Sequence, residues 1–289
     1  MNKRNAIIMA AGTSSRFVPL SAERPKGLVE VKGEVLIERQ IRQLKEAGIA
    51  DITLVVGYKA EMFAYLRDKY GVEIVLNEDY ARYNNTSSLI RVIDKLDNTF
   101  VCSSDNYFPE NVFMNDSDDS YYSALYAEGE TNEYCLTTDA DDYITDVRVG
   151  GCDAWYMVGH VFFNREFSEA FRNIMTEEYK NDTTRKGYWE DLYIRYIDQL
   201  PKMKINRYKE GEIQEFDSLD ELRLFDDSYI ADTRSIVVKS ICRTLNLQES
   251  DVYGFKNIKH VGDYLYFQFK VGDTTYEYND KTEIRIEKI

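Results

Sequence analysis

The fold is first indicated by Ala6-Ile7-Ile8-Met9-Ala10-Ala11-Gly12-Thr13-Ser14-Ser15-Arg16-Phe17, an apolar segment that leads directly into a run of small residues. The apolar part is typical of a buried strand. The small residues let the backbone amides approach a phosphate group closely. The stretch lacks the three glycines of a dinucleotide-binding loop and the Gly-Lys-Ser/Thr end of a P-loop. It therefore predicts a strand followed by a phosphate-binding loop, and it disfavours hydride transfer and ordinary ATP hydrolysis.

Apolar runs alternate with amphipathic stretches through the first hundred residues. Further strands are expected at 52–56, 72–76 and 99–103, and helices at 35–47, 60–70 and 87–96. Strands that alternate with helices favour parallel pairing and right-handed crossovers. The expected fold class is α/β, with a Rossmann-like mixed, mainly parallel sheet.

The pattern changes in the second half of the chain. Between about residues 121 and 161 aromatic and polar residues alternate, which predicts an antiparallel insertion. Beyond it we expect helices at 168–179 and 189–200, a strand pair at 204–208 and 213–216, and a helix that opens with the capping box Ser218-Leu219-Asp220-Glu221. The last part of the chain is expected to form a small α+β appendage. The pattern there predicts a helix at 233–245, aromatic-rich alternation at 258–278 and a turn at 271–274. The expected domains are 1–228, catalytic, and 229–289, the appendage.

The composition disfavours several classes of function. The 289 residues include 51 acidic and 36 basic side chains, for a formal net charge of -15, and no basic patch for nucleic acid is evident. No apolar run approaches the roughly 20 residues of a membrane helix, so no membrane insertion is expected. The four cysteines form no Cys-x-x-Cys pair, which favours reduced thiols and a cytoplasmic location. Since His160 and His260 are the only histidines, a His-rich metal site is excluded and a Ser-His-Asp triad would have to use one of them.

Motifs along the chain resemble a known group of enzymes. The early motifs resemble nucleotidyltransferases that join an NTP to a sugar phosphate or a small alcohol phosphate; they are Ile8-Met9-Ala10-Ala11-Gly12, Ser15-Arg16-Phe17, Pro25-Lys26, Leu36-Ile37 and Gly48-Ile49. The later motifs resemble the bacterial CTP:phosphocholine cytidylyltransferases; they are Tyr83-Asn84-Asn85, Ser104-Asp105-Asn106-Tyr107, Thr131-Asn132-Glu133-Tyr134, Asp191-Leu192-Tyr193 and Glu215-Phe216-Asp217-Ser218. The resemblance covers about residues 5–227. It implies the nucleotidyltransferase type of sheet and transfer of CMP from CTP to a small aminoalkyl phosphate or phosphonate, with release of pyrophosphate.

This reaction assigns roles to three groups of residues. Ala10, Ala11, Gly12 and Thr13 are expected to hold the triphosphate. Arg16 and Lys26 are expected to neutralise it, as catalytic residues. Asn84, Asn85 and Ser88 are expected to help read the cytosine and the ribose.

Carboxylates at the ends of expected strands predict a metal site. Asp105 and Asp217 each follow a strand, and Glu215 shares a strand face with Asp217. A set of oxygen ligands alone implies Mg²⁺. The phosphate or phosphonate of the acceptor is largely ionised at neutral pH and needs no strong general base. In the alternative reading Asp105 makes an Asx-turn, Asp217 caps the next helix and Glu215 is solvated.

A third group combines aromatic rings with carboxylates and is the expected acceptor site. It consists of Glu133, Tyr134, Tyr188, Trp189, Glu190 and Asp191. Aromatic faces suit a choline-like cation and carboxylates suit a primary ammonium, so phosphocholine and 2-aminoethylphosphonate both stay open. The rings are alternatively core residues. The chain also departs from the family's pattern at 150–160.

The appendage resembles the opening hairpin of a choline kinase amino-terminal lobe over 258–278, and it stops before any catalytic loop. We interpret it as a truncated lobe that serves packing or dimerisation, so a homodimer is expected. Two other functions stay open, a sugar-1-phosphate nucleotidyltransferase and a non-catalytic nucleotide-binding regulator.

Overall fold

The computed structural model describes residues 3–258, 264–281 and 285–288. Two compact units are formed, one from Met1–Gly12 with Ile37–Glu215 and the other from Thr13–Leu36 with Phe216–Ile289. The expected division between residues 228 and 229 falls inside the second unit, and the assignment of a catalytic domain and an appendage stays a prediction. His260 lies outside the described residues. Within the described part of the chain, no helix has both the length and the apolar character needed to cross a membrane.

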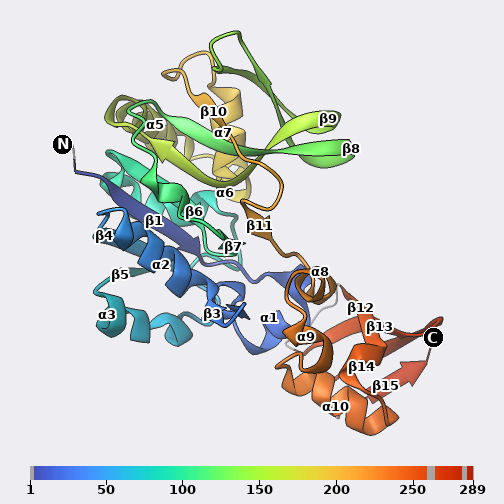
Figure 1. The fold of residues 1–289 in the computed structure, drawn as a ribbon. Coiled ribbons are helices and arrows are strands. Elements are labelled where there is room, and N and C mark those ends of the chain that lie inside the picture. Colours follow the sequence, from blue (N-terminus) through green and yellow to red (C-terminus); the bar gives the residue numbers. More distant parts are fainter. Residues whose placement is uncertain (1–2, 259–263, 282–284, 289) are drawn as a thin grey trace. The chain divides into compact units, whose positions relative to one another are not determined.

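The first unit is built on a seven-stranded sheet in the order β10-β8-β9-β6-β1-β4-β5 (Figure 1). The strands are β1 (Asn5–Ala10), β4 (Asp51–Val56), β5 (Glu73–Leu76), β6 (Thr99–Ser103), β8 (Tyr121–Thr138), β9 (Ile144–Phe163) and β10 (Lys204–Arg207). β1 pairs in parallel with β4 and β6, and β4 pairs in parallel with β5. β9 runs antiparallel to both β6 and β8. The mixed, mainly parallel sheet and its antiparallel insertion are thereby confirmed.

One expected strand pair is wrong. β10 pairs in parallel with β8, whereas β11 (Gln214–Glu215) pairs antiparallel with β7 (Asn106–Tyr107). The two segments therefore lie next to strands from distant parts of the chain and not next to each other. Local alternation indicates that a strand forms, but it does not identify the neighbouring strand.

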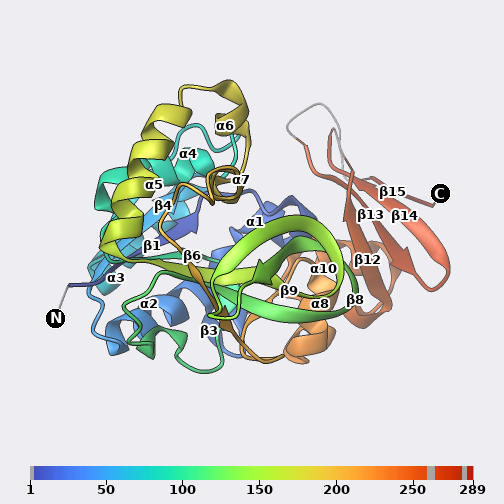
Figure 2. The same ribbon diagram turned by 90° about the horizontal axis from the view of Figure 1, so that it is seen from above.

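Helices cover both faces of this sheet. They are α2 (Leu36–Glu46), η3 (Ala60–Phe63), α3 (Tyr65–Tyr70), α4 (Thr86–Leu89), η4 (Ile90–Lys95), η5 (Val112–Met114), α5 (Arg165–Glu178), α6 (Asp182–Lys186) and α7 (Trp189–Arg195). Figure 2 shows α5 and α2 on opposite faces. The helix expected at 87–96 is found as α4 followed directly by η4, and η4 is interrupted at Val92, whose φ of -129° is not helical.

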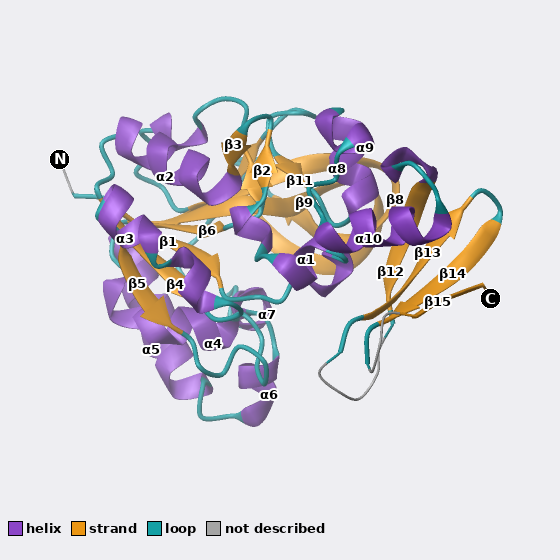
Figure 3. Cartoon of the chain, turned by 90° about the horizontal axis from the view of Figure 1, so that it is seen from below, coloured by secondary structure: helices purple, strands orange, loops and turns teal. Residues whose placement is uncertain are grey.

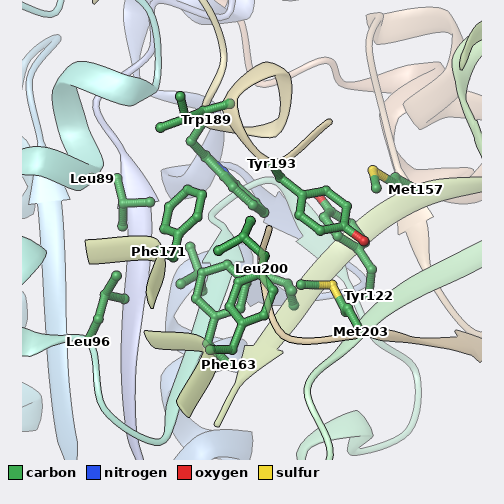
Figure 4. Packing of buried hydrophobic residues seen from close by; sticks show 14 of the residues in the cluster. Leu89, Leu96, Tyr122, Met157, Phe163, Phe171, Trp189, Tyr193, Leu200 and Met203 are labelled. Atoms are coloured by element: carbon green, nitrogen blue, oxygen red, sulfur yellow. The ribbon is translucent and has the colours of Figure 1, made fainter. Parts of the chain in front are cut away.

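A large apolar core lies between the sheet and α4, η4, α5 and α7 (Figure 4). Phe163 on β9 is fully buried, and its ring lies 4.6 Å from the ring of Phe167, 5.5 Å from that of Phe171 and 5.5 Å from that of Trp189, centroid to centroid. Tilted and edge-on contacts of this kind add to the stabilisation that burial alone provides. The core thus holds α5 and α7 against the sheet.

The second unit joins the segment after the first strand to the C-terminal residues. Its elements are η1 (Ser15–Phe17), α1 (Leu20–Glu23), η2 (Lys26–Leu28), β2 (Glu30–Val31), β3 (Glu34–Val35), α8 (Leu219–Phe225), α9 (Ser228–Ala231), α10 (Ile236–Leu245), η6 (Glu249–Asp251), β12 (Val252–Asn257), β13 (Tyr266–Val271), β14 (Thr274–Asn279) and β15 (Arg285–Lys288). The last four strands form an antiparallel sheet, and β13 and β14 turn at the predicted 271–274. This sheet and α10 confirm a small α+β assembly at the C-terminal end.

Glu23 attaches α1 to α10, which lie side by side in Figure 3. Its carboxylate accepts hydrogen bonds from the amides of Ile236 and Val237, at 3.0 and 3.1 Å, and from the hydroxyl of Ser235. A carboxylate at a helix N-terminus satisfies unpaired amides and opposes the positive end of the helix dipole. This contact explains why a segment near the start of the chain belongs to the C-terminal unit.

Phe163→Ala is expected to lower the free energy of unfolding of the first unit by about 3–5 kcal/mol, because it leaves a cavity among three rings. Both tryptophans, Trp155 and Trp189, lie in this unit, so urea unfolding followed by tryptophan fluorescence measures the change. Met114, which is 61% exposed, provides the control. Met114→Ala should change the free energy by less than about 0.5 kcal/mol, and equal losses for the two variants would contradict the assigned core.

Candidate functional site

The loops that follow β1, β4 and β6 meet at one edge of the sheet. In the parallel register Ala10 lies beside Val56, and Met9 lies beside Ser103. The amide of Tyr58 donates to the carbonyl of Ala11, with the atoms 3.1 Å apart. Ligands of parallel α/β sheets bind at the carboxyl ends of the strands. Ala10, Ala11 and Gly12 are therefore at the edge of the sheet where ligands of such folds bind.

Gly57 directly after β4 is a residue that the sequence analysis missed. A Cβ atom at this position would lie 2.7 Å from the Cβ of Tyr80 and 2.9 Å from the carbonyl oxygen of Ala11. Only glycine allows these groups to approach so closely. A glycine immediately after a buried strand was the available signal.

Asp105 lies in the turn between β6 and β7 and is partly buried. The amide of the preceding Ser104 donates to the carbonyl of Met9 at 3.2 Å, which ties this turn to β1. Glu215 is exposed on β11 and pairs with Asn106 of β7, and its carboxylate accepts a hydrogen bond from the side-chain nitrogen of Asn106 at 3.3 Å. Asp105 and Glu215 are thus both close to Asn106 in the first unit.

In the second unit Asp217 is held between the two predicted phosphate ligands. Its carboxylate lies 2.7 Å from Nη1 of Arg16 and 3.4 Å from Nζ of Lys26. The Lys26 side chain is 4% exposed, whereas that of Arg16 is 77% exposed. A long exposed side chain gains little from a single ion pair and can change partners, whereas a buried ammonium requires a compensating anion. Thr13 is exposed in the loop between β1 and η1.

Ser218 caps α8 as predicted, but the reciprocal bond expected of a capping box is made to the amide of Asp217 and not to that of Ser218. The hydroxyl of Ser218 accepts a hydrogen bond from the amide of Glu221 at 3.2 Å, and the Glu221 carboxylate accepts one from the amide of Asp217 at 2.9 Å. Ser218 is therefore the N-cap of α8. The alternative reading, in which the Asp217 side chain caps the helix, is wrong.

The segment predicted to read the nucleotide is joined to the segment predicted to bind the acceptor. The side-chain oxygen of Asn85 accepts a hydrogen bond from the amide of Trp189 at 2.8 Å, and its nitrogen donates to Glu190 at 3.1 Å. The hydroxyl of Thr86 donates to the carbonyl of Gly187 at 2.7 Å. Since both ends of the Asn85 amide are bonded within the protein, this residue primarily holds the two segments together.

Asn84 and Ser88 also make bonds within the protein. Asn84 accepts a hydrogen bond from the Asn85 amide through its side-chain oxygen, and the hydroxyl of Ser88 accepts one from Asn77 at 3.0 Å. Ser88 is buried, whereas Asn84 is partly exposed. Contact of Asn84, Asn85 and Ser88 with a nucleotide stays a prediction.

Glu190 and Asp191 place two carboxylates next to each other at the start of α7. Glu190 accepts hydrogen bonds from the hydroxyl of Tyr122 at 3.2 Å and from Asn85, and burial raises the pKa of Glu190 to about 7. Asp191 accepts from the hydroxyl of Tyr134 at 2.8 Å and from the amide of Tyr188 at 2.9 Å. Tyr122 was missed by the sequence analysis, because one tyrosine in an aromatic-rich strand has no distinguishing local pattern.

The other predicted acceptor residues differ widely in exposure. Trp189 is 2% exposed and stacks on Tyr122, with ring centroids 5.8 Å apart and planes at 16°. Its ring also contacts Phe163 and Phe171 edge-on. Trp189 therefore belongs to the core, and one face of its ring is covered by Tyr122. Tyr188 is 47% exposed, and Glu133 is exposed on β8. A direct acceptor contact is therefore available to Tyr188 and Glu133 but not to the Trp189 ring.

His160 is a core residue. Burial lowers its pKa to about 3, and the rings of Phe100, Phe108 and Phe113 lie around it. Its ring nitrogens lie 3.2 and 3.3 Å from the hydroxyl of Ser123, which is also fully buried. A neutral, enclosed imidazole cannot exchange protons with a substrate, so this serine–histidine contact is not part of a catalytic triad.

Comparisons with known proteins identify the family of this chain. Residues 6–116 match the MobA-like NTP transferase domain. The chain is 36% identical to the choline-phosphate cytidylyltransferase of Streptococcus pneumoniae over 77% of its own length and 96% of the relative's. It is 34% identical to the 2-aminoethylphosphonate cytidylyltransferase of Lancefieldella rimae, over 81% of this chain and 96% of that one.

Solved structures give the same result. The CTP:phosphocholine cytidylyltransferase of S. pneumoniae has a TM-score of 0.75 at 36% identity, and the match covers 78% of this chain and 99% of that chain. The inositol-1-phosphate CTP transferase of T. maritima, at 16% identity and a TM-score of 0.58, shares the fold. The protein is therefore an enzyme of the nucleotidyltransferase class, and it belongs to the family of cytidylyltransferases that includes the choline-phosphate and 2-aminoethylphosphonate enzymes.

Proposed function

We propose that this enzyme transfers CMP from CTP to a small phosphate or phosphonate that carries a positively charged amine. The observation that carries the proposal is the carboxylate pair Glu190 and Asp191. Among the described residues, neither carboxylate has a lysine or arginine within ion-pair distance. Partly buried carboxylates without a cation are unfavourable unless a ligand supplies one. The amine of the acceptor is such a ligand.

The reaction forms a bond between an acceptor oxygen and the α-phosphorus of CTP and breaks the bond to the β-phosphate, so pyrophosphate leaves. Negative charge develops on the phosphate oxygens as this happens. Arg16 and Lys26 are the cations that would stabilise this charge, and Ala10 to Thr13 would supply backbone amides. The acceptor's own ionised oxygen is the nucleophile, so the scarcity of histidines in the chain is no obstacle.

We propose that Asp105 and Asp217 hold Mg²⁺, with Glu215 as a further candidate ligand. Carboxylate oxygens are the ligands that Mg²⁺ prefers, and Mg²⁺ is commonly bound by one or two carboxylates together with substrate phosphates. No cluster of three or more His, Cys, Asp or Glu side chains suited to a metal occurs in residues 3–258, 264–281 and 285–288. With the triphosphate completing the coordination, two carboxylates would be enough to hold the ion. When bound, the ion would add positive charge at the phosphate oxygens.

The surroundings of Glu190 favour a primary ammonium over a trimethylammonium group. A trimethylammonium group needs open aromatic faces. Trp189 is buried, and Tyr122, which bonds Glu190, is 8% exposed and stacked against it, so only the neighbouring Tyr188, at 47% exposure, offers an open ring among these three. A primary ammonium instead donates hydrogen bonds, and Glu190 and Asp191 are acceptors. We therefore propose 2-aminoethylphosphonate or phosphoethanolamine as the preferred acceptor. The homodimer and the cytoplasmic location stay predictions.

Pyrophosphate release with CTP and Mg²⁺ tests the acceptor directly. Rates with 2-aminoethylphosphonate, phosphoethanolamine and phosphocholine are compared, and kcat/KM for the better of the two primary amines should exceed that for phosphocholine by at least about 10-fold, the equivalent of 1.4 kcal/mol. Faster turnover of phosphocholine would overturn the preference for a primary amine. Absence of turnover with all three, or equal use of UTP and a hexose 1-phosphate, would overturn the proposed function.

Lys26→Met should lower kcat by about 10²–10³-fold, because it removes a fixed positive charge that would act on the triphosphate. Lys202 provides the control, since its side chain is 69% exposed and pairs with Asp139 at 3.4 Å. Steady-state pyrophosphate release should be unchanged in Lys202→Met. A kcat for Lys26→Met within a few-fold of the wild-type value would remove Lys26 from the mechanism.

Glu190→Gln should stabilise the free enzyme, and the gain should grow with pH. In the wild type the pKa of Glu190 rises from 4.5 when unfolded to about 7 when folded, so the native state loses stability as pH increases from about 4.5 to about 7. Glutamine has no such charge, and the difference should reach about 1–3 kcal/mol at pH 8 and be small at pH 5. Urea unfolding between pH 5 and pH 8 measures it. Glu133→Gln, at an exposed position, is the control, and a difference independent of pH would contradict the buried charge.

A further inference from the structure

One side of α2 holds the turn that carries Asp105. Side chains of α2 donate six hydrogen bonds to backbone carbonyls of residues 103–110, and the donors are Arg39, Gln40 and Gln43. Arg39 bonds the carbonyls of Phe108 and Pro109, at 2.8 and 2.6 Å. Backbone carbonyls in such a segment need hydrogen-bond donors, and these side chains of α2 supply them in addition to the pairing of β7 with β11.

Gln40 makes the two bonds that enclose Asp105. Its side-chain nitrogen donates to the carbonyl of Ser103 and to the carbonyl of Asn106, both at 2.9 Å. These carbonyls lie two residues before and one residue after Asp105 in sequence. Gln40 is fully buried on α2, whose side chains at Ile37, Ile41 and Leu44 are also fully buried. The donor group therefore has little freedom to move.

We propose that Gln40 is a positioning residue that fixes the backbone on both sides of Asp105 and thereby orients this carboxylate toward Mg²⁺. The inference rests on the proposed function, in which Asp105 is a metal ligand. A carboxylate on an unsupported turn would have to be ordered each time the ion binds, and that ordering weakens binding. Groups behind metal ligands raise affinity by removing this cost. Gln40 would act on the metal site without touching the metal or the substrates.

Gln43 is a matched control on the same helix. It is 2% exposed, and its side-chain nitrogen also donates to two backbone carbonyls, those of Phe108 and Glu110, at 2.9 and 3.2 Å. The side-chain oxygens of Gln40 and Gln43 both lack a hydrogen-bond partner among the described residues. The two glutamines thus have the same chemistry and burial, and they differ in distance along the chain from Asp105.

The experiment compares Gln40→Met with Gln43→Met, since methionine keeps the length of the side chain and removes the donor. Thermal unfolding should show similar losses of stability in both variants. Backbone hydrogen–deuterium exchange in peptides that cover 103–107 should accelerate in Gln40→Met and stay near the wild-type rate in Gln43→Met. This measurement needs neither metal nor turnover.

Metal affinity is measured with Mn²⁺ as the probe, by electron paramagnetic resonance, on the enzyme with CTP and without acceptor. After subtraction of Mn²⁺ bound by CTP alone, Gln40→Met should weaken binding by about 10-fold, and Gln43→Met by less than about 2-fold. In turnover, Gln40→Met should raise the half-saturating Mg²⁺ concentration by a similar factor, and excess Mg²⁺ should restore most of kcat. A purely structural defect would not be restored by Mg²⁺.

Equal effects of the two variants on exchange and on Mn²⁺ affinity would overturn the positioning role. The variant Asp105→Asn separates this proposal from the proposed function. If Asp105→Asn leaves the Mn²⁺ affinity unchanged, Asp105 is not a metal ligand and the positioning role of Gln40 fails. CTP-dependent pyrophosphate release by the wild-type enzyme would still support the proposed function in that case. If no acceptor is turned over but Gln40→Met selectively weakens Mn²⁺ binding, the positioning role stands and the proposed function fails.

Discussion

The pairing of β1 between β4 and β6 is the constraint on which the arrangement of the first unit depends. It places the ends of three strands at one edge, so that Ala11, Gly57 and Ser104 follow strands that end side by side. Parallel pairing is regular, and a shift by one residue would turn buried side chains toward the opposite face. The apolar faces that pack against α2 and α5 therefore also determine the positions of the loops. Asp105 lies where it does because β6 ends at Ser103 beside Met9.

A second constraint in the first unit is the set of hydrogen bonds between the start of α4 and the start of α7. Asn85 and Thr86 bond the backbone and side chains of residues 187–190, so α4 and α7 hold each other in place. Glu190 takes part in this contact and also accepts a hydrogen bond from the hydroxyl of Tyr122, whose ring stacks on Trp189. The aromatic core and the carboxylates of Glu190 and Asp191 are thus connected through Tyr122 and Trp189. A buried carboxylate reduces the stability of the free protein, and such groups are concentrated at functional sites.

The sequence predicted the features that depend on neighbouring residues. The strand at 99–103, the helix start at Ser218 and the turn at 271–274 were found because strand periodicity, helix capping and turn chemistry act over a few residues. The partner of β10 was not predictable, because pairing with β8 joins residues about eighty positions apart. The roles of Gln40 and Tyr122 were not predicted for the same reason. Glutamine in a helix and tyrosine in a strand are ordinary, and only tertiary contacts give them a role.

The charges of Arg16, Lys26 and Asp217 in the second unit compensate one another in the free protein. The buried ammonium of Lys26 is compensated in part by Asp217, which also pairs with the exposed Arg16. Phosphate oxygens would compete with this carboxylate for both cations, and their greater negative charge would prevail. Asp217 would then be available to a divalent ion that accompanies the phosphates. Under the proposed function, the same three residues would neutralise one another in the free enzyme and would become separate phosphate and metal ligands once the nucleotide is bound.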